Sequence, residues 1–164
     1  MIIVWIVSAI LALLIGIMIW CKISIEMDKK KGIQFKSKDL LYLDGYEDLS
    51  GTDDVTITVY FHTFSLEFKN KGKVEKIKLR RIKDVKIYQQ EELLSEVKYH
   101  KIKTTHNFND KNIVSKKYIV IKVMEEQGDR TLIFASGFPE LIKGTLEKAK
   151  ESEINNDTQA VVSK

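Results

Sequence analysis

Residues Val55–Phe68 read VTITVYFHTFSLEF and carry the clearest structural signal in the part of the chain that follows the N-terminal segment. Apolar side chains alternate with polar ones from Val55 to Phe61, and the alternation resumes at Phe64 after His62 and Thr63. Because successive side chains of a strand point to opposite faces, a period of two gives each strand one apolar face. The stretch therefore predicts an antiparallel hairpin with its apolar face buried.

Further strands are expected on both sides of this hairpin, at Leu40–Leu43, Val74–Leu79, Ile82–Tyr88, Tyr118–Met124 and Arg130–Ala135. The alternation changes phase at Arg80 and Arg81, which predicts a corner or a bulge between two of these strands. A turn at Gly128 and Asp129 joins the last two. Residues 91–117 are rich in lysine, histidine and asparagine and carry the weakest pattern in the domain.

A C-terminal helix is expected around Pro139, since proline suits the first helical turn. Its predicted apolar stripe comprises Phe138, Leu141, Ile142, Thr145, Leu146 and Ala149. After Lys150 the chain is polar, and we expect a disordered tail at residues 151–164. Antiparallel strands followed by one amphipathic helix predict a mainly β fold, an antiparallel barrel or sandwich closed by the C-terminal α-helix.

Upstream of the strands, Ile2–Cys21 reads IIVWIVSAILALLIGIMIWC and contains no charged side chain. At about 1.5 Å per residue, a helix of this length spans about 30 Å, the thickness of the hydrocarbon core of a bilayer. Trp5 and Trp20 lie near its two ends, where aromatic rings favour the membrane interface. A cleaved signal peptide is disfavoured, because no basic residue precedes the apolar run and Ile17–Trp20 is bulky. The segment predicts a retained transmembrane helix.

The orientation of this helix follows from the lysines that come after it, Lys22, Lys29, Lys30, Lys31, Lys36 and Lys38. The positive-inside rule places them in the cytoplasm, with the N-terminus outside. We expect a single-pass protein of the cell membrane. Its predicted parts are a transmembrane helix at 1–21, a lysine-rich linker at 22–38, a domain at 39–150 and the tail at 151–164.

Three small residues, Ser8, Ala12 and Gly16, recur every four positions and share one face of the apolar helix. Such a row lets two helices approach closely in a membrane, so this face is a candidate for self-association. Small residues are also common in single transmembrane helices, which leaves a passive face as the alternative.

Five parts of the chain carry a family resemblance: Leu41–Tyr46 (LYLDGY), the hairpin Val55–Phe68, Ile77–Val85 (IKLRRIKDV), the strands Tyr118–Ile121 and Leu132–Phe134, and the terminal helix. Their order over about residues 38–150 resembles the pleckstrin-homology-like (PH-like) superfold, and within it the bacterial membrane-attached and GRAM-like members. The resemblance implies a binding module, not an enzyme. Some members bind phosphoinositides through basic residues on the early strands and loops, and others bind peptides. Residues 91–117 depart from the glycine-rich insert of many bacterial relatives.

Residues 69–86 hold nine basic side chains against Glu75 and Asp84, in a chain whose formal net charge is only +4. The candidate site residues for a lipid or a protein partner are Lys71, Lys73, Lys76, Lys78, Arg80, Arg81 and Lys83. They can dock an anionic membrane surface. Alternatively, they are solvated outward positions of strands that discourage aggregation between sheet edges.

Other kinds of chemistry find no support in the sequence. His62, His100 and His106 match no standard ligand spacing, so no metal site or other cofactor is expected. Phosphate-binding loops and catalytic motifs are absent, and the mixed charge does not favour a nucleic-acid partner. We expect a membrane-anchored binding module for a protein partner, with anionic-lipid binding as the alternative and an unrecognised enzyme as a remote one.

Overall fold

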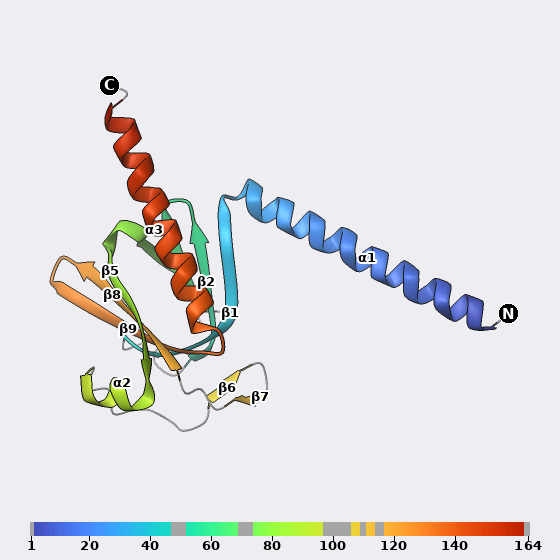
Figure 1. Ribbon diagram of the computed structural model, residues 1–164, viewed down its shortest axis with the longest axis horizontal. Helices are drawn as coiled ribbons and strands as arrows, with labels where there is room; N and C mark the ends of the chain where they lie inside the picture. The colour runs from blue at the N-terminus through green and yellow to red at the C-terminus, as the bar shows by residue number, and fades with distance from the viewer. Residues whose placement is uncertain are drawn as a thin grey trace. The chain divides into compact units, whose positions relative to one another are not determined.

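The structure is a computed structural model, and it describes residues 2–46, 52–68, 74–96, 106–108, 111–113 and 117–162. The chain divides into two compact units, Met1–Gln34 and Phe35–Lys164 (Figure 1). The first unit is mainly one helix, and the second is a β domain with helices.

The helix α1 runs from Ile2 to Lys30 and is long and apolar enough to cross a membrane. Its large apolar side chains are all exposed, from 48% for Ile17 to 77% for Trp5. A helix that packs in a soluble protein buries at least one apolar stripe. By its length and composition, α1 can therefore span the hydrocarbon core of a bilayer.

The helix is longer than the apolar run that predicts it, since it continues past Cys21 to Lys30. The strand β1 (Ile33–Asp44) then begins after a turn at Lys31 and Gly32, where Gly32 has a φ of 74°. Most of the segment that the sequence predicts as a linker, residues 22–38, is therefore helix or strand. Lys22 to Lys30 contain no glycine or proline to stop the helix, and the lysines of the last turn favour its negative end.

The domain is built on a seven-stranded sheet in the order β4-β3-β2-β1-β9-β8-β5. Its other strands are β2 (Thr52–Tyr60), β3 (Thr63–Phe68), β4 (Val74–Lys78), β5 (Ile82–Gln89), β8 (Lys117–Glu125) and β9 (Gly128–Ser136). β1 to β4 form one meander, and β5, β8 and β9 form a second. The antiparallel pairing of β1 with β9, from Leu40 opposite Ser136 to Tyr42 opposite Phe134, joins the two meanders. The antiparallel β domain with an N-terminal and a C-terminal helix confirms the coarse fold prediction.

Shorter elements complete the domain. The 3-10 helix η2 (Leu79–Arg81) connects β4 to β5 at the predicted change of phase. The helix α2 (Gln90–Glu96) follows β5, and β6 (His106–Phe108) pairs with β7 (Lys111–Ile113) in a separate two-stranded sheet. The weakly patterned segment 91–117 therefore contains regular structure.

The central strands of the sheet bury apolar side chains on both faces. Leu40 and Tyr42 lie in the main core, which the two meanders share with α3. Leu41 and Leu43 point the other way, into a second buried cluster that includes Tyr118 and Leu93 of α2. Burial on both faces explains why Leu40–Leu43 is a continuous apolar run, whereas β2 and β3, with one core face, alternate.

The helix α3 runs from Pro139 to Val162 and packs against η2, β5, β8 and β2 (Figure 1). Its buried positions Ile142, Leu146 and Ala149 confirm part of the predicted stripe. Phe138 and Leu141 were wrongly included, since they are 61% and 59% exposed. Phe138 precedes the first turn, and Leu141 lies about 100° around the axis from Ile142. α3 also continues beyond Lys150, through most of the segment predicted as a tail.

Gly45 begins the turn after β1 and has a φ of +133°. An added Cβ would lie 2.5 Å from Cδ2 of Leu132 and 2.9 Å from the hydroxyl of Tyr42. The Tyr42 hydroxyl also accepts a hydrogen bond from the backbone N–H of Tyr46, and its ring meets Phe134 edge to face at 5.4 Å between centroids. The turn therefore has no room for a side chain.

We predict that Gly45→Ala destabilises the domain by about 3 kcal/mol, because backbone strain and a steric clash both act at this position. Gly128→Ala is the matched control, since Gly128 also has a positive φ but an added Cβ there meets nothing within 4 Å. It is expected to cost about half as much. Denaturant unfolding of the full chain in detergent measures both, and equal losses would contradict the steric account.

Candidate interaction surface

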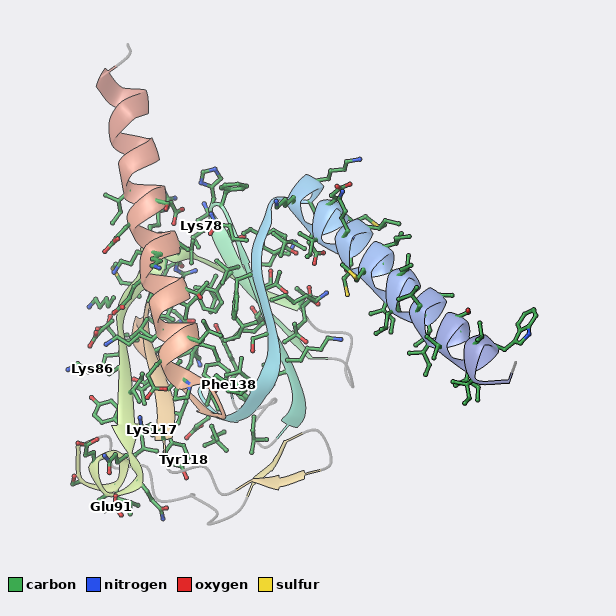
Figure 2. All side chains as sticks on the ribbon, turned by 45° about the vertical axis from the view of Figure 1, so that its right-hand side comes forward. Lys78, Lys86, Glu91, Lys117, Tyr118 and Phe138 are labelled. Carbon is green, nitrogen blue, oxygen red and sulfur yellow. The ribbon has the colours of Figure 1, made fainter. Side chains whose placement is uncertain are left out.

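Five of the seven basic residues predicted as a site lie in three successive elements. Lys76 and Lys78 lie on β4, Arg80 and Arg81 lie in η2, and Lys83 is the second residue of β5. Lys71 and Lys73 lie outside the described residues. Figure 2 shows that the basic segment does not form one patch, since Lys78 lies at one end of the domain and Lys86 on its side.

Two of the predicted residues are engaged within the domain. Nε of Arg81 donates a hydrogen bond of 2.7 Å to the backbone oxygen of Met124. Nζ of Lys83 lies 2.6 Å from a carboxylate oxygen of Asp129. Both contacts connect the start of β5 with the hairpin formed by β8 and β9. The ion pair is solvent-exposed, so it contributes on the order of 0.5 kcal/mol and mainly orients the two side chains.

Lys76, Lys78 and Arg80 are exposed, and no ion pair joins them to any other described residue. In the ladder between β3 and β4, Lys76 lies opposite Ser65 and Lys78 opposite Thr63. The two lysines are two residues apart on one strand, so they share a face. We call Lys76, Lys78 and Arg80 the basic edge, because β4 is the last strand at that end of the sheet.

A polar row runs beside this edge on the same face of the sheet. Thr58 and Ser65 lie opposite each other on β2 and β3, and each is at most 1% exposed. The hydroxyl groups of both residues lack a hydrogen-bond partner in the described part of the chain. Because both hydroxyls are inaccessible to solvent, the reachable chemistry of this face lies with the lysines of β4.

The densest polar cluster lies elsewhere, at the turn after β1, and sequence reasoning did not find it. Arg130 donates one hydrogen bond of 2.8 Å to Glu125 and another of 2.8 Å to the backbone oxygen of Gly45. Its guanidinium also lies 4.6 Å from the ring centre of Tyr46, whose hydroxyl donates to Glu125 at 3.2 Å. These contacts fasten the end of β1 to the β8–β9 hairpin. They join residues up to 85 positions apart, so no local pattern reveals them.

Burial, reinforced by the charge of Glu125, raises the pKa of Tyr46 to about 12. Burial also raises the pKa of Tyr42. The hydrogen bond to Glu125 raises the pKa of Arg130, which therefore stays charged. The arrangement holds neutral phenols and one satisfied ion pair, which is typical of a structural connection and not of an acid–base pair.

Ser8, Ala12 and Gly16, which the sequence predicts as a helix-pairing face, lie about one turn apart on the continuous helix α1. The Ser8 hydroxyl donates a 2.9 Å hydrogen bond back to the oxygen of Val4, which satisfies it within its own helix. An added Cβ at Gly16 would meet nothing within 4 Å.

Among the described side chains, no group of three or more histidine, cysteine, aspartate or glutamate residues is arranged to hold a metal ion. Cys21 is a free, exposed cysteine. Comparison of the sequence with models of protein families found no match, and comparison with curated proteins found no similar sequence. The geometry of this chain is therefore the basis of the proposals that follow.

The raised pKa of Tyr46 gives a pH-dependent prediction. The folded state keeps the phenolic proton up to about pH 12, whereas the unfolded chain releases it near 10, so stability falls as the pH rises between these values. Tyr46→Phe is expected to make this alkaline decline shallower, as measured by denaturant unfolding in detergent across that range.

Glu125→Gln tests whether the charge of Glu125 contributes to the raised pKa of Tyr46. Removal of the carboxylate charge lowers the pKa of Tyr46, so phenolate absorbance develops at a lower pH than in the wild type. If stability falls as steeply in Tyr46→Phe as in the wild type, and phenolate absorbance in Glu125→Gln develops at an unchanged pH, the raised pKa is not that of Tyr46.

Proposed function

We propose that this chain is a single-pass membrane protein that presents a PH-like binding module to the cytoplasm, where the module binds a protein partner. The observation that carries the proposal is that one chain joins a long apolar helix to a β domain with an exposed basic edge. An apolar helix that buries nothing within the chain leads, after the turn at Lys31 and Gly32, into a β domain with an open basic edge. A tethered domain of this kind stays close to the membrane and is available for binding.

The element order supports the PH-like assignment. A four-stranded meander and a three-stranded meander share one core, and a C-terminal helix packs against strands of both. This is the arrangement that the resemblance to bacterial membrane-attached and GRAM-like proteins implies. The absence of matching family models leaves the assignment to rest on topology alone.

The lysines after the apolar run support the cytoplasmic orientation. Lys22, Lys29 and Lys30 lie on the polar continuation of α1, and Lys31 follows in the turn. About nine residues of helix follow Cys21 and extend roughly 13 Å. The face of Ser8, Ala12 and Gly16 additionally suits pairing of two copies within the bilayer.

Binding of an anionic leaflet is a second candidate function. It is supported by the exposed Lys76, Lys78 and Arg80, which form no ion pair with another described residue and each contribute about 1 kcal/mol at a charged surface. Because Arg81 and Lys83 are engaged inside the domain, the free charge available for this role is smaller than the sequence implies.

The orientation is tested by labelling. Cys21 is the only cysteine of the chain, so Cys21→Ser with Gln127→Cys places one thiol in the exposed turn between β8 and β9. We expect a membrane-impermeant maleimide to label it only after the cells are permeabilised. Labelling in intact cells would refute the cytoplasmic assignment, and an introduced cysteine at Ile3 serves as the opposite control.

The binding role is tested by crosslinking in the membrane. A photo-crosslinking residue at Lys78, on the exposed edge, is expected to yield a discrete adduct with one protein, identified by mass spectrometry. The same residue at Gln127, in the β8–β9 turn, is the control. If no position on the domain yields a discrete adduct, the proposed function is wrong.

A further inference from the structure

The two ends of the seven-stranded sheet differ in how they are protected. At one end, β5 lies beside α3, and Nζ of Lys150 donates a 3.2 Å hydrogen bond to the backbone oxygen of Lys83. At the other end, β4 pairs with β3 alone among the described strands. No described residue supplies a partner for the outer backbone groups of β4. Among the described residues, α3 therefore supplies a contact to β5 at one end, whereas β4 at the other end has no neighbour besides β3.

The side chains of β4 have a charge pattern along this open edge. Lys76 and Lys78 share one face, and Val74, two residues before Lys76, is 50% exposed on the same face. Ile77 points to the opposite face and is buried in the core, which fixes the alternation of the strand. An added strand would therefore meet one apolar and two cationic positions on the exposed face.

A second copy of β4 does not fit this edge. When two antiparallel strands extend one sheet, directly opposite side chains lie on the same face. In the register that pairs the whole of β4, Lys76 of one copy would then lie opposite Lys76 of the other, and Lys78 opposite Val74. Since Glu75 lies on the other face, it supplies no compensating charge. Like charges directly opposite each other destabilise strand pairing, so self-pairing is disfavoured.

We propose that β4 is the binding site for an extended acidic segment of a partner protein, which adds to the sheet as an eighth strand. Backbone hydrogen bonds to β4 would supply affinity, and carboxylates at alternate positions, opposite Lys76 and Lys78, would supply specificity. The inference rests on the proposed function and names the chemistry of its partner. It is favoured over a lipid surface because an anionic headgroup uses the lysine charges but leaves the open backbone edge unpaired.

The test uses the full chain in nanodiscs of neutral lipid and a short fluorescent peptide in which glutamate alternates with valine. Saturable binding to the wild type is expected. Lys76→Gln/Lys78→Gln is expected to weaken it about tenfold, through the loss of two cross-strand ion pairs. Lys86→Gln/Lys122→Gln is the matched control, because it removes the same charge from exposed positions on β5 and β8 and is expected to leave binding unchanged.

A second peptide, with alternate backbone amides N-methylated, keeps every carboxylate but cannot pair as a strand. We expect it to bind at least tenfold more weakly than its parent. Equal binding of the two peptides would overturn the proposal, because charge alone would then explain the affinity. The proposal would also be overturned if Phe138→Ser/Leu141→Ser lost peptide binding while Lys76→Gln/Lys78→Gln kept it. The binding site would then lie at the start of α3.

Two further outcomes separate this inference from the proposed function. Suppose the wild type binds no peptide, but its domain binds the surface of anionic nanodiscs and this binding is lost in Lys76→Gln/Lys78→Gln. The edge is then a lipid-binding surface, and the inference is wrong. If membrane crosslinking captures a protein partner equally from the wild type and the Lys76→Gln/Lys78→Gln variant, the β4 inference fails while the binding role stands. If no partner is captured at all, the proposed function itself fails.

Discussion

The pairing of β1 with β9 is the interaction on which the rest of the domain depends. β1 lies between β2 and β9 in the sheet, so it belongs to both meanders at once. Without this pairing, the four-stranded and three-stranded parts would each expose an edge and half of a core. The same strand begins after the turn that ends α1, so the element that unites the domain is also the one that follows the long apolar helix. The contacts of Arg130 and Tyr46 fasten its far end.

The distribution of charge follows from this architecture. Residues 69–86 look uniformly basic in sequence, but they run along β4, through a 3-10 corner and into β5. The corner turns Arg81 toward Met124, and β5 places Lys83 beside Asp129 of the neighbouring hairpin. Lys76 and Lys78 precede the corner and lie exposed on β4, the last described strand of the sheet. A run of like charge in sequence therefore divides into residues that are engaged within the domain and residues that are exposed on β4.

The two ends of the sheet also show how the C-terminal helix shapes the exposed surface. α3 packs beside β5 and one of its lysines bonds a carbonyl of that strand, which removes β5 as a site for further pairing. β4 retains exposed lysines, a common protection against aggregation between sheet edges. The charge that discourages pairing with another copy is also the charge that the proposed acidic strand would meet, so protection and the proposed recognition have the same physical basis.

The sequence by itself determined the elements whose patterns are local. The uncharged run Ile2–Cys21 predicted a helix long and apolar enough to span a membrane, and the alternation in Val55–Phe68 predicted a hairpin with one apolar face buried. Pro139 marked the start of the last helix, and the phase change at Arg80 marked the corner. Each of these elements is determined by contacts between residues close in sequence, or by contact with the surrounding medium, so a local sequence pattern is sufficient to predict it.

Only the tertiary structure decided the features that depend on residues far apart. Leu41 is buried on the face opposite the main core because strands and a helix from other parts of the chain meet there, whereas Leu141 is exposed because the stripe of α3 centres on Ile142 and Leu146. The junction of Arg130 with Gly45 and Tyr46 has no local signature, because it forms only when the end of β1 meets the β8–β9 hairpin. Which lysines remain free is likewise settled by strand order, since a side chain's partners are set by what lies beside it in space and not along the chain.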